Sequence, residues 1–178
     1  MDSDKILYQA FLEGDISAFE ELVLRYRHNL VYFILQFLKD YQSAEDIAQE
    51  VFAYIYVNPE RYSSSYQFKT YLFMLGKRRA IDFLRKYRSR KYVPLEDVEV
   101  EEIHSLEDII FQKESARLIK QAIQEMKPEY RQVLVLIYLN GLSIAETAEV
   151  MNRSVAAIKV LSHRAKKSLK EILGEGGI

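Results

Sequence analysis

Two parts of the sequence combine residue types that suit the binding of nucleic acid. The first begins at Tyr62, where five aromatic residues lead into a run of eight lysines and arginines that contains one acid, Asp82. The aromatic residues are Tyr62, Tyr66, Phe68, Tyr71 and Phe73, and the cations are Lys77, Arg78, Arg79, Arg85, Lys86, Arg88, Arg90 and Lys91. Bases stack on aromatic rings while cations follow the phosphates, so the pattern indicates a surface for single-stranded nucleic acid. For Phe68 and Tyr71, packing in the core of a helix is an equally good interpretation.

The second part, residues 133–173, has the pattern of a helix-turn-helix whose second helix is cationic. Ser143 and Glu146 have the spacing of a capping box, which starts a short helix. Between Arg153 and Lys170 the chain has six lysines or arginines and no acid, whereas a solvated helix ordinarily mixes both signs. The spacing in the second helix predicts a buried stripe of Val155, Ile158, Leu161, Ala165, Leu169 and Ile172, opposite an exposed face with Lys159, Val160, His163 and Lys167. Such a helix suits the major groove of DNA, and a merely solvated basic face is the alternative.

A third pattern lies near residue 50, where polar side chains share one face of a predicted helix. Asp46, Gln49 and Glu50 are spaced three and four residues apart, and so face the same side. The opposite, buried face is predicted to consist of Ile47, Ala48, Val51, Phe52 and Ile55. No nucleophile or metal partner stands near the two carboxylates, so a catalytic pair is disfavoured. A solvated face and a patch that docks on a partner both remain open.

The sequence gives little support to an enzyme. Its three histidines, at positions 28, 104 and 163, are scattered, and no zinc-peptidase, serine-hydrolase or phosphate-loop motif occurs. Cysteine is absent, so disulfides and thiolate metal sites are excluded. We therefore predict a protein that is not an enzyme and needs neither a cofactor nor a metal.

Composition predicts an all-α protein of the cytoplasm. The 178 residues are 49% apolar but include only three prolines and six glycines, which favours long helices and few tight turns. No apolar run is long enough to cross a bilayer, and the first residues are acidic where a signal peptide is basic. We expect no insertion into the membrane.

The charges divide the chain into two cationic blocks and an acidic tether. Residues 1–92 carry 14 basic and 12 acidic side chains, and residues 113–178 carry 11 basic and 7 acidic ones. Residues 93–112 carry seven acids and no lysine or arginine. We predict a first domain over 1–91, a flexible acidic linker over 92–105 and a second domain over 106–178.

Apolar periodicity and turn residues place four helices in the first domain. The predicted ranges are 4–13, 17–39, a third helix capped by Ser43 that ends at Val57, and 67–88, with a polar loop over 59–66. The buried positions expected in the second of these helices are Phe19, Leu22, Val23, Tyr26, Leu30, Phe33, Ile34 and Phe37. In the second domain, helices over 106–126 and 128–139 precede the helix-turn-helix.

Taken in order, these patterns resemble one family, the extracytoplasmic-function (ECF) group of bacterial RNA polymerase sigma factors. Residues 15–19 (DISAF) are similar to the start of the region 2 domain, and 44–52 (AEDIAQEVF) to its polymerase-binding signature. Residues 68–72 (FKTYL) and 79–85 (RAIDFLR) are similar to its −10 segment. Residues 141–143 (GLS) through 164–169 (RAKKSL) are similar to region 4. The resemblance covers nearly the whole chain.

The resemblance implies two small helical domains that direct core RNA polymerase to promoters. Asp46, Gln49 and Glu50 would face the beta and beta-prime subunits of the polymerase. The first domain would open the −10 element and capture a flipped base, with contacts from Tyr66, Phe68, Lys69, Tyr71, Arg78, Arg79 and Arg85. The second would read the −35 element with Lys159, Val160, His163 and Arg164, and hold phosphates with Lys166 and Lys167. An anti-sigma factor is the further partner that the family implies.

The sequence also departs from the family pattern. Arg78 replaces a frequent asparagine, Tyr71 stands where tryptophan is common, and Val155-Ala156 stand where Gly-Thr is usual. These changes bear on the preferred promoter sequence. The alternative to a sigma factor is a stand-alone helix-turn-helix regulator that uses its first domain for dimerisation or sensing.

Overall fold

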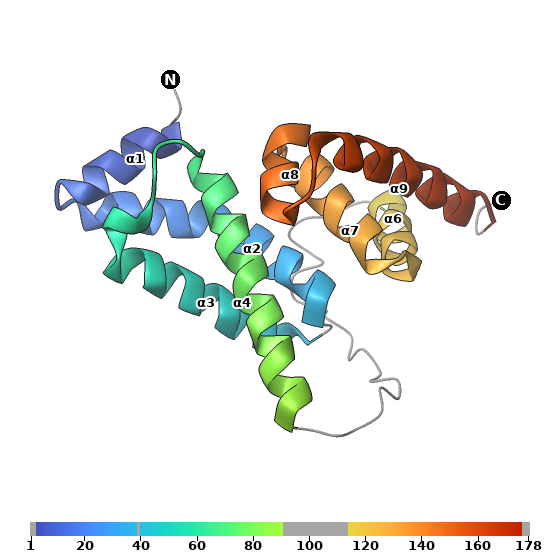
Figure 1. Cartoon of the computed structure of the whole chain (residues 1–178), viewed down its shortest axis with the longest axis horizontal. Helices are drawn as coiled ribbons and strands as arrows, with labels where there is room; N and C mark the ends of the chain where they lie inside the picture. The colour runs from blue at the N-terminus through green and yellow to red at the C-terminus, as the bar shows by residue number, and fades with distance from the viewer. Residues whose placement is uncertain (1–2, 39, 91–113, 176–178) are drawn as a thin grey trace. The chain divides into compact units, whose positions relative to one another are not determined.

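The computed structural model describes residues 3–38, 40–90 and 114–175, and every regular element within these ranges is a helix. The predicted all-α class is therefore confirmed. The chain divides into two compact units, Met1–Pro94 (unit 1) and Leu95–Ile178 (unit 2), each with its own buried apolar residues (Figure 1). The expected linker over 92–105 and the first residues of the expected helix over 106–126 lie outside the described ranges. None of the described helices has the length and apolar character that a membrane span requires.

Unit 1 contains four α-helices, close to the ranges that the sequence predicts. They are α1 (Ser3–Leu12), α2 (Ile16–Leu38), α3 (Tyr41–Val57) and α4 (Phe68–Arg90), and a single 3₁₀ turn, η1 (Pro59–Arg61), lies between α3 and α4. Figure 1 shows α1 beside the first half of α2, and α4 crossing α2 and α3. A polar loop, residues 62–67, therefore lies directly before α4.

The core of unit 1 is aromatic and aliphatic. Its largest fully buried side chains are Leu22, Leu30, Phe33, Ile34, Ile55, Phe68, Leu72 and Phe73. Of the positions predicted to be buried in α2, Val23, Tyr26 and Phe37 are only partly so. Helices α2 and α4 approach closely at Gly76, where an added Cβ would lie 2.7 Å from the Leu30 Cδ1 atom. A larger residue at this position would require the Leu30 side chain to shift.

The start of α3 differs from the prediction. The capping residue is Asp40, whose carboxylate accepts a hydrogen bond from the backbone N–H of Ser43 at 2.9 Å. Ser43 therefore lies inside the first turn and is not the cap. Hydrogen bonding from Ser43 lowers the pKa of Asp40, because it stabilises the charged carboxylate. An aspartate satisfies the first-turn donors as well as a serine does, so sequence pattern alone does not decide between two capping residues three positions apart.

Helix α1 is held to α2 by a charged group. Asp4 is 6% exposed, and its carboxylate accepts a hydrogen bond from Arg25 at 2.5 Å and another from the Tyr26 hydroxyl. Arg25 also pairs with Glu21, one turn earlier on α2. A buried carboxylate is tolerated when it is paired and hydrogen-bonded, so these contacts fix the position of α1 along α2.

Unit 2 contains α6 (Glu114–Glu125), α7 (Pro128–Leu134), a π-helical turn η2 (Val135–Leu139), α8 (Ile144–Met151) and α9 (Val155–Glu175). The predicted single helix over 128–139 thus changes its winding after Leu134. The backbone N–H of Asn140 bonds to the carbonyl of Val135 at 3.1 Å, and the Asn140 side chain donates to the same oxygen at 2.8 Å. These bonds five residues apart define the wider turn.

The predicted capping box of α8 is confirmed. The Glu146 N–H donates to the Ser143 hydroxyl at 3.1 Å, and the Ser143 N–H donates to the Glu146 carboxylate at 2.7 Å. The turn after α8 passes through Asn152 in the left-handed region, with φ of 53°. Ser154 then caps α9 by accepting from the N–H of Ala157 at 3.1 Å. The two helices of the helix-turn-helix are therefore both started by serine.

Ser143→Ala removes the acceptor for the Glu146 N–H, and we expect α8 to lose about 1 kcal/mol of local stability. The protected amides of α8 should then exchange with deuterium about fivefold faster, which hydrogen-exchange mass spectrometry of the full chain measures. Ser168→Ala, the same chemical change in α9, is the control. Unchanged exchange in α8 would show that the capping box does not stabilise this helix.

Candidate nucleic-acid and partner interfaces

The loop before α4 is closed by its own hydrogen bonds. The Tyr62 hydroxyl donates to the carbonyl of Tyr66 at 2.7 Å, and the Tyr66 N–H donates to the carbonyl of Ser63 at 3.2 Å. The hydroxyls of Ser63 and Ser65 lie 2.8 Å apart. These bonds hold residues 62–66 in one compact turn whose serines face the solvent.

Phe68 lies beneath this loop rather than on its surface. Its ring is fully buried and packs against the rings of Tyr8, Tyr26 and Tyr62, at centroid distances of 5.5, 5.9 and 6.0 Å. Of the two interpretations of Phe68 that the sequence leaves open, the structure shows packing. The ring has no free face for a base to stack on, so Phe68 takes part only by supporting the loop.

Tyr71 keeps a partly exposed ring at the edge of the same cluster. It lies 5.3 Å from the Tyr62 ring, and burial raises the pKa of its hydroxyl. Like an ordinary tyrosine it is protonated at neutral pH and can donate a hydrogen bond. Tyr66 and Lys69 are also partly exposed. The structure thus brings Tyr66, Lys69 and Tyr71 to the loop and the first turn of α4.

The cations of α4 divide into two groups. Arg78 and Arg85 are exposed, and the nearest carboxylate to Arg85 is that of Asp82, 3.9 Å away. Arg79 is partly buried, with its guanidinium 5.4 Å from the centre of the Tyr54 ring on α3. The Arg85–Asp82 pair is long and exposed and neutralises little charge, so Arg78 and Arg85 remain available to an anion. Arg79 also connects α4 to α3 through its contact with Tyr54.

The face of α3 that carries Asp46, Gln49 and Glu50 is exposed, and Ile47, Ala48, Val51, Phe52 and Ile55 are buried, as the spacing predicts. Asp46 accepts a hydrogen bond from Gln42 at 3.1 Å, one turn earlier. Helix α3 contains no lysine or arginine, so this face is negative. Among the described residues no cluster of His, Asp or Glu has the arrangement of a metal site.

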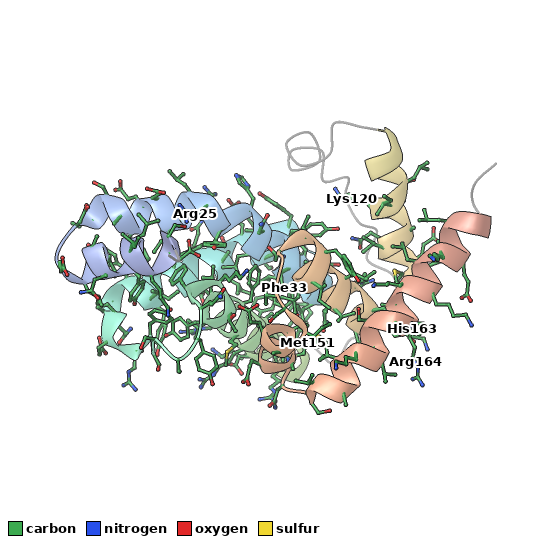
Figure 2. The ribbon with its side chains drawn as sticks, turned by 90° about the horizontal axis from the view of Figure 1, so that it is seen from above. Arg25, Phe33, Lys120, Met151, His163 and Arg164 are labelled. Atoms are coloured by element: carbon green, nitrogen blue, oxygen red, sulfur yellow. The ribbon has the colours of Figure 1, made fainter. Side chains whose placement is uncertain are left out.

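The outer face of α9 carries the residues that the sequence assigns to DNA. Lys159, Val160, His163, Arg164, Lys166 and Lys167 are all exposed. Figure 2 shows the side chains of His163 and Arg164 projecting from this outer side. Ile158, Leu161 and Ala165 are buried on the inner side, and Leu169 and Ile172 are partly buried. Helix α9 therefore has a buried apolar side and an exposed cationic side, its cationic front.

Val155 does not belong to the buried stripe, which corrects the prediction. It is 44% exposed, and Ala156 is exposed beside it at the first turn of α9. The buried stripe of α9 therefore begins at Ile158, one turn later. In helix-turn-helix proteins the N-terminal residues of the second helix contact base edges. The apolar spacing did not identify Val155 and Ala156 as surface positions of this kind.

Lys166 is held toward the π-helical turn. Its ammonium lies 5.1 Å from the centre of the Tyr138 ring, and Tyr138 is 56% exposed. Hydrogen bonding from Lys166 and Ser162 lowers the pKa of Tyr138, since a donor stabilises the phenolate. Lys167 lies 3.8 Å from Glu171, an exposed pair that neutralises little charge.

The helical fold and the exposed cationic surfaces of α4 and α9 are those of the DNA-binding class of protein that the sequence predicts. Residues 22–90 match the family model described as Sigma-70 region 2, and residues 116–169 match the one described as Sigma-70, region 4. The ECF RNA polymerase sigma factor SigW of Bacillus subtilis (strain 168) is 30% identical over 171 residues, which cover 90% of this chain and 91% of SigW. The chain belongs to the ECF group of RNA polymerase sigma factors, and it directs promoter-specific initiation of transcription.

Two solved structures share the fold. The sigma factor RpoE from Bartonella quintana, in complex with the anti-sigma factor NepR, gives a TM-score of 0.71 at 19% identity, over 89% of this chain and 98% of that one. CnrH, in complex with the cytosolic domain of CnrY, gives 0.69 at 22% identity, over 99% of this chain and 100% of that one. Sigma factors are non-catalytic initiation factors, and a stand-alone regulator is not favoured because both sigma regions match.

Proposed function

We propose that the surfaces of this sigma factor divide the work of initiation. The exposed face of α3 docks on the beta and beta-prime subunits of core RNA polymerase, the loop and α4 open and hold the −10 element, and α9 reads the −35 element. The observation that carries this division is the segregation of sign. Helix α3 has carboxylates and no cation, whereas no acid occurs between Arg153 and Lys170. DNA is drawn to the second kind of surface and repelled from the first.

At the −10 element, the loop and α4 would stabilise DNA that has left the duplex. Extruding a base costs a few kcal/mol, and stacking on an aromatic ring returns about 1–3 kcal/mol per base. Tyr66 and Tyr71 offer partly exposed rings for this purpose, and Lys69, Arg78 and Arg85 offer charges for the phosphates. Arg79, held on Tyr54, and the buried Phe68 support this surface.

At the −35 element, α9 would lie in the major groove. Lys159, His163 and Arg164 can donate hydrogen bonds to base edges, and the exposed Val160 can contact a thymine methyl group. Val155 and Ala156 extend the apolar contact at the first turn. Lys166 and Lys167 flank this face and would bind phosphates, which position the helix without reading sequence.

We also infer that an anti-sigma factor regulates this chain in the cytoplasm. RpoE and CnrH share the fold and were solved with a partner of this kind or with a cytosolic domain. A protein that covered the α3 face would block the polymerase, and one that covered α9 would block the promoter. The active chain would lie with the polymerase on the nucleoid.

Reconstitution with core RNA polymerase tests the proposal as a whole. We expect the purified chain alone to bind duplex DNA weakly, and the holoenzyme to start transcripts from genomic DNA at a set of sites with shared −35 and −10 sequences. Sequencing the 5′ ends of run-off transcripts maps these sites. Tight and specific duplex binding by the chain alone, with no new transcripts on addition of core, would favour a stand-alone regulator.

Asp46→Asn combined with Glu50→Gln removes both charges from the α3 face while keeping the shape of the side chains. We expect affinity for core polymerase to fall about tenfold or more, since each charged contact contributes on the order of 1 kcal/mol. Fluorescence titration with labelled chain measures this. Glu13→Gln combined with Glu20→Gln changes the net charge equally at two exposed carboxylates outside α3. If the two double variants behave alike, α3 is not the docking face.

Lys159→Ala and Lys167→Ala separate base reading from phosphate binding on α9. Lys159→Ala should cost about 1–3 kcal/mol at a promoter mapped with the holoenzyme, and should relax sequence preference at one −35 position. Lys167→Ala should weaken all promoters alike and lower the slope of log affinity against log salt by about 1. Holoenzyme binding to −35 substitution series at several salt concentrations gives both quantities. The reverse pattern would exchange the two roles.

A further inference from the structure

Helix α1 carries none of the surfaces described above, yet one of its side chains reaches the loop before α4. Tyr8 is 2% exposed, and its hydroxyl donates a hydrogen bond to the carbonyl of Pro59 at 2.8 Å, across 51 positions of sequence. Pro59 begins η1, the turn that leads into the loop. We propose that Tyr8 is a positioning residue for the −10 loop, an inference that rests on the function proposed above for that loop.

The ring of Tyr8 contacts both ends of the loop. It lies 4.6 Å from the Tyr62 ring, edge to face at 68°, and 5.5 Å from the Phe68 ring. Tyr62 directly follows η1, and Phe68 is the first residue of α4. One buried side chain thus sets the separation between the two points where the loop leaves and rejoins the helices.

The position of the loop depends on Tyr62, because a hydrogen bond joins this residue to the far end of the loop. The bond from the Tyr62 hydroxyl to the Tyr66 carbonyl, 2.7 Å long, fixes the far end of the turn relative to its start. A shift of η1 or Tyr62 therefore moves residues 63–66 together. The Pro59 carbonyl, which accepts from the Tyr8 hydroxyl, also accepts from the Tyr62 N–H at 3.4 Å, so Tyr8 and Tyr62 share this anchoring atom.

Tyr8 can hold the loop in position because α1 is itself fixed along α2. Asp4 on α1 is bound by Arg25 and by the Tyr26 hydroxyl of α2, and the Tyr26 ring packs against Phe68 at 5.9 Å. The Tyr8 hydroxyl is protonated at neutral pH, as a tyrosine ordinarily is, and burial raises its pKa further from that range. A binding site needs its contacting groups held to about 0.5 Å by packing and hydrogen bonds around them, and this network supplies such support to the loop.

Tyr8→Phe tests the inference, because it removes the hydroxyl and keeps the ring. The measurement uses the holoenzyme and four templates of a promoter mapped as above, which differ only at the −10 base with the strongest preference. We expect the ratio of transcription from the best base to that from the other three to fall about threefold to tenfold, the size of effect that one hydrogen bond produces. Affinity for core polymerase should be unchanged. Tyr62→Phe, which opens the loop itself, should give the same selective loss.

Two matched controls separate positioning from general destabilisation. Phe37→Leu trims a partly buried ring of α2 that packs on Phe33 at 5.3 Å rather than on Tyr8 or the loop, and it should lower output from all four templates equally, if at all. Tyr56→Phe removes a hydroxyl from a 45% exposed tyrosine and should have no effect. An equal loss on all four templates for Tyr8→Phe, or no loss, would overturn the inference. A wild-type holoenzyme without any base preference in the opened region would instead overturn the proposed role of the loop, and this is visible without the variant.

Discussion

The nucleic-acid surface proposed for unit 1 depends on the burial of one aromatic side chain, Phe68. Because its ring is enclosed by Tyr8, Tyr26 and Tyr62, the first turn of α4 is fixed to both α1 and α2. The loop before α4 and the partly exposed rings beside it are then held in one conformation, in which they can meet a DNA strand. Aromatic packing of this kind contributes both area burial and directional contacts, so the loop is supported by the strongest part of the core. A binding loop on such a base loses little entropy when a strand arrives.

Charge then decides which partner each surface can take. The exposed face of α3 repels DNA and attracts basic protein surface, whereas the exposed arginines of α4 and the front of α9 do the reverse. At physiological salt these fields extend only about 8 Å, so each surface acts mainly on a partner that is already close to it. The whole chain has a net charge of −1 and a pI of about 6.3, because residues 93–112 contribute seven acids. Its average charge thus conceals the local charged surfaces to which we assign binding.

Sequence reasoning was reliable where a local rule had no competitor. Ser143 and Glu146 form the capping box that their spacing predicts, and the alternation of Asp46 with Ile47 and Val51 sorts exposed from buried positions on α3. It failed where tertiary context decides. Asp40 caps α3 in place of Ser43, and Val155 is exposed although its spacing matches the buried stripe. A π-helical turn replaces the α-helix over 135–139, where Asn140 bonds to the carbonyl of Val135. The supporting role of Tyr8 has no sequence signal, because a contact across 51 residues is visible only after folding. The roles of the surface residues themselves remain predictions.

The near-neutral total charge has a consequence for when this protein can read DNA. Long-range attraction to DNA needs a net field, and a chain with 25 basic and 26 acidic residues does not produce one at a distance. Its cationic faces therefore become effective only within about a Debye length of the duplex. A large partner that already holds DNA would bring both units into that range at once and turn two weak contacts into one strong complex. On the function proposed above, the α3 face would be the dominant control point, because loss of its docking contact would remove the effective concentration on which both DNA contacts depend.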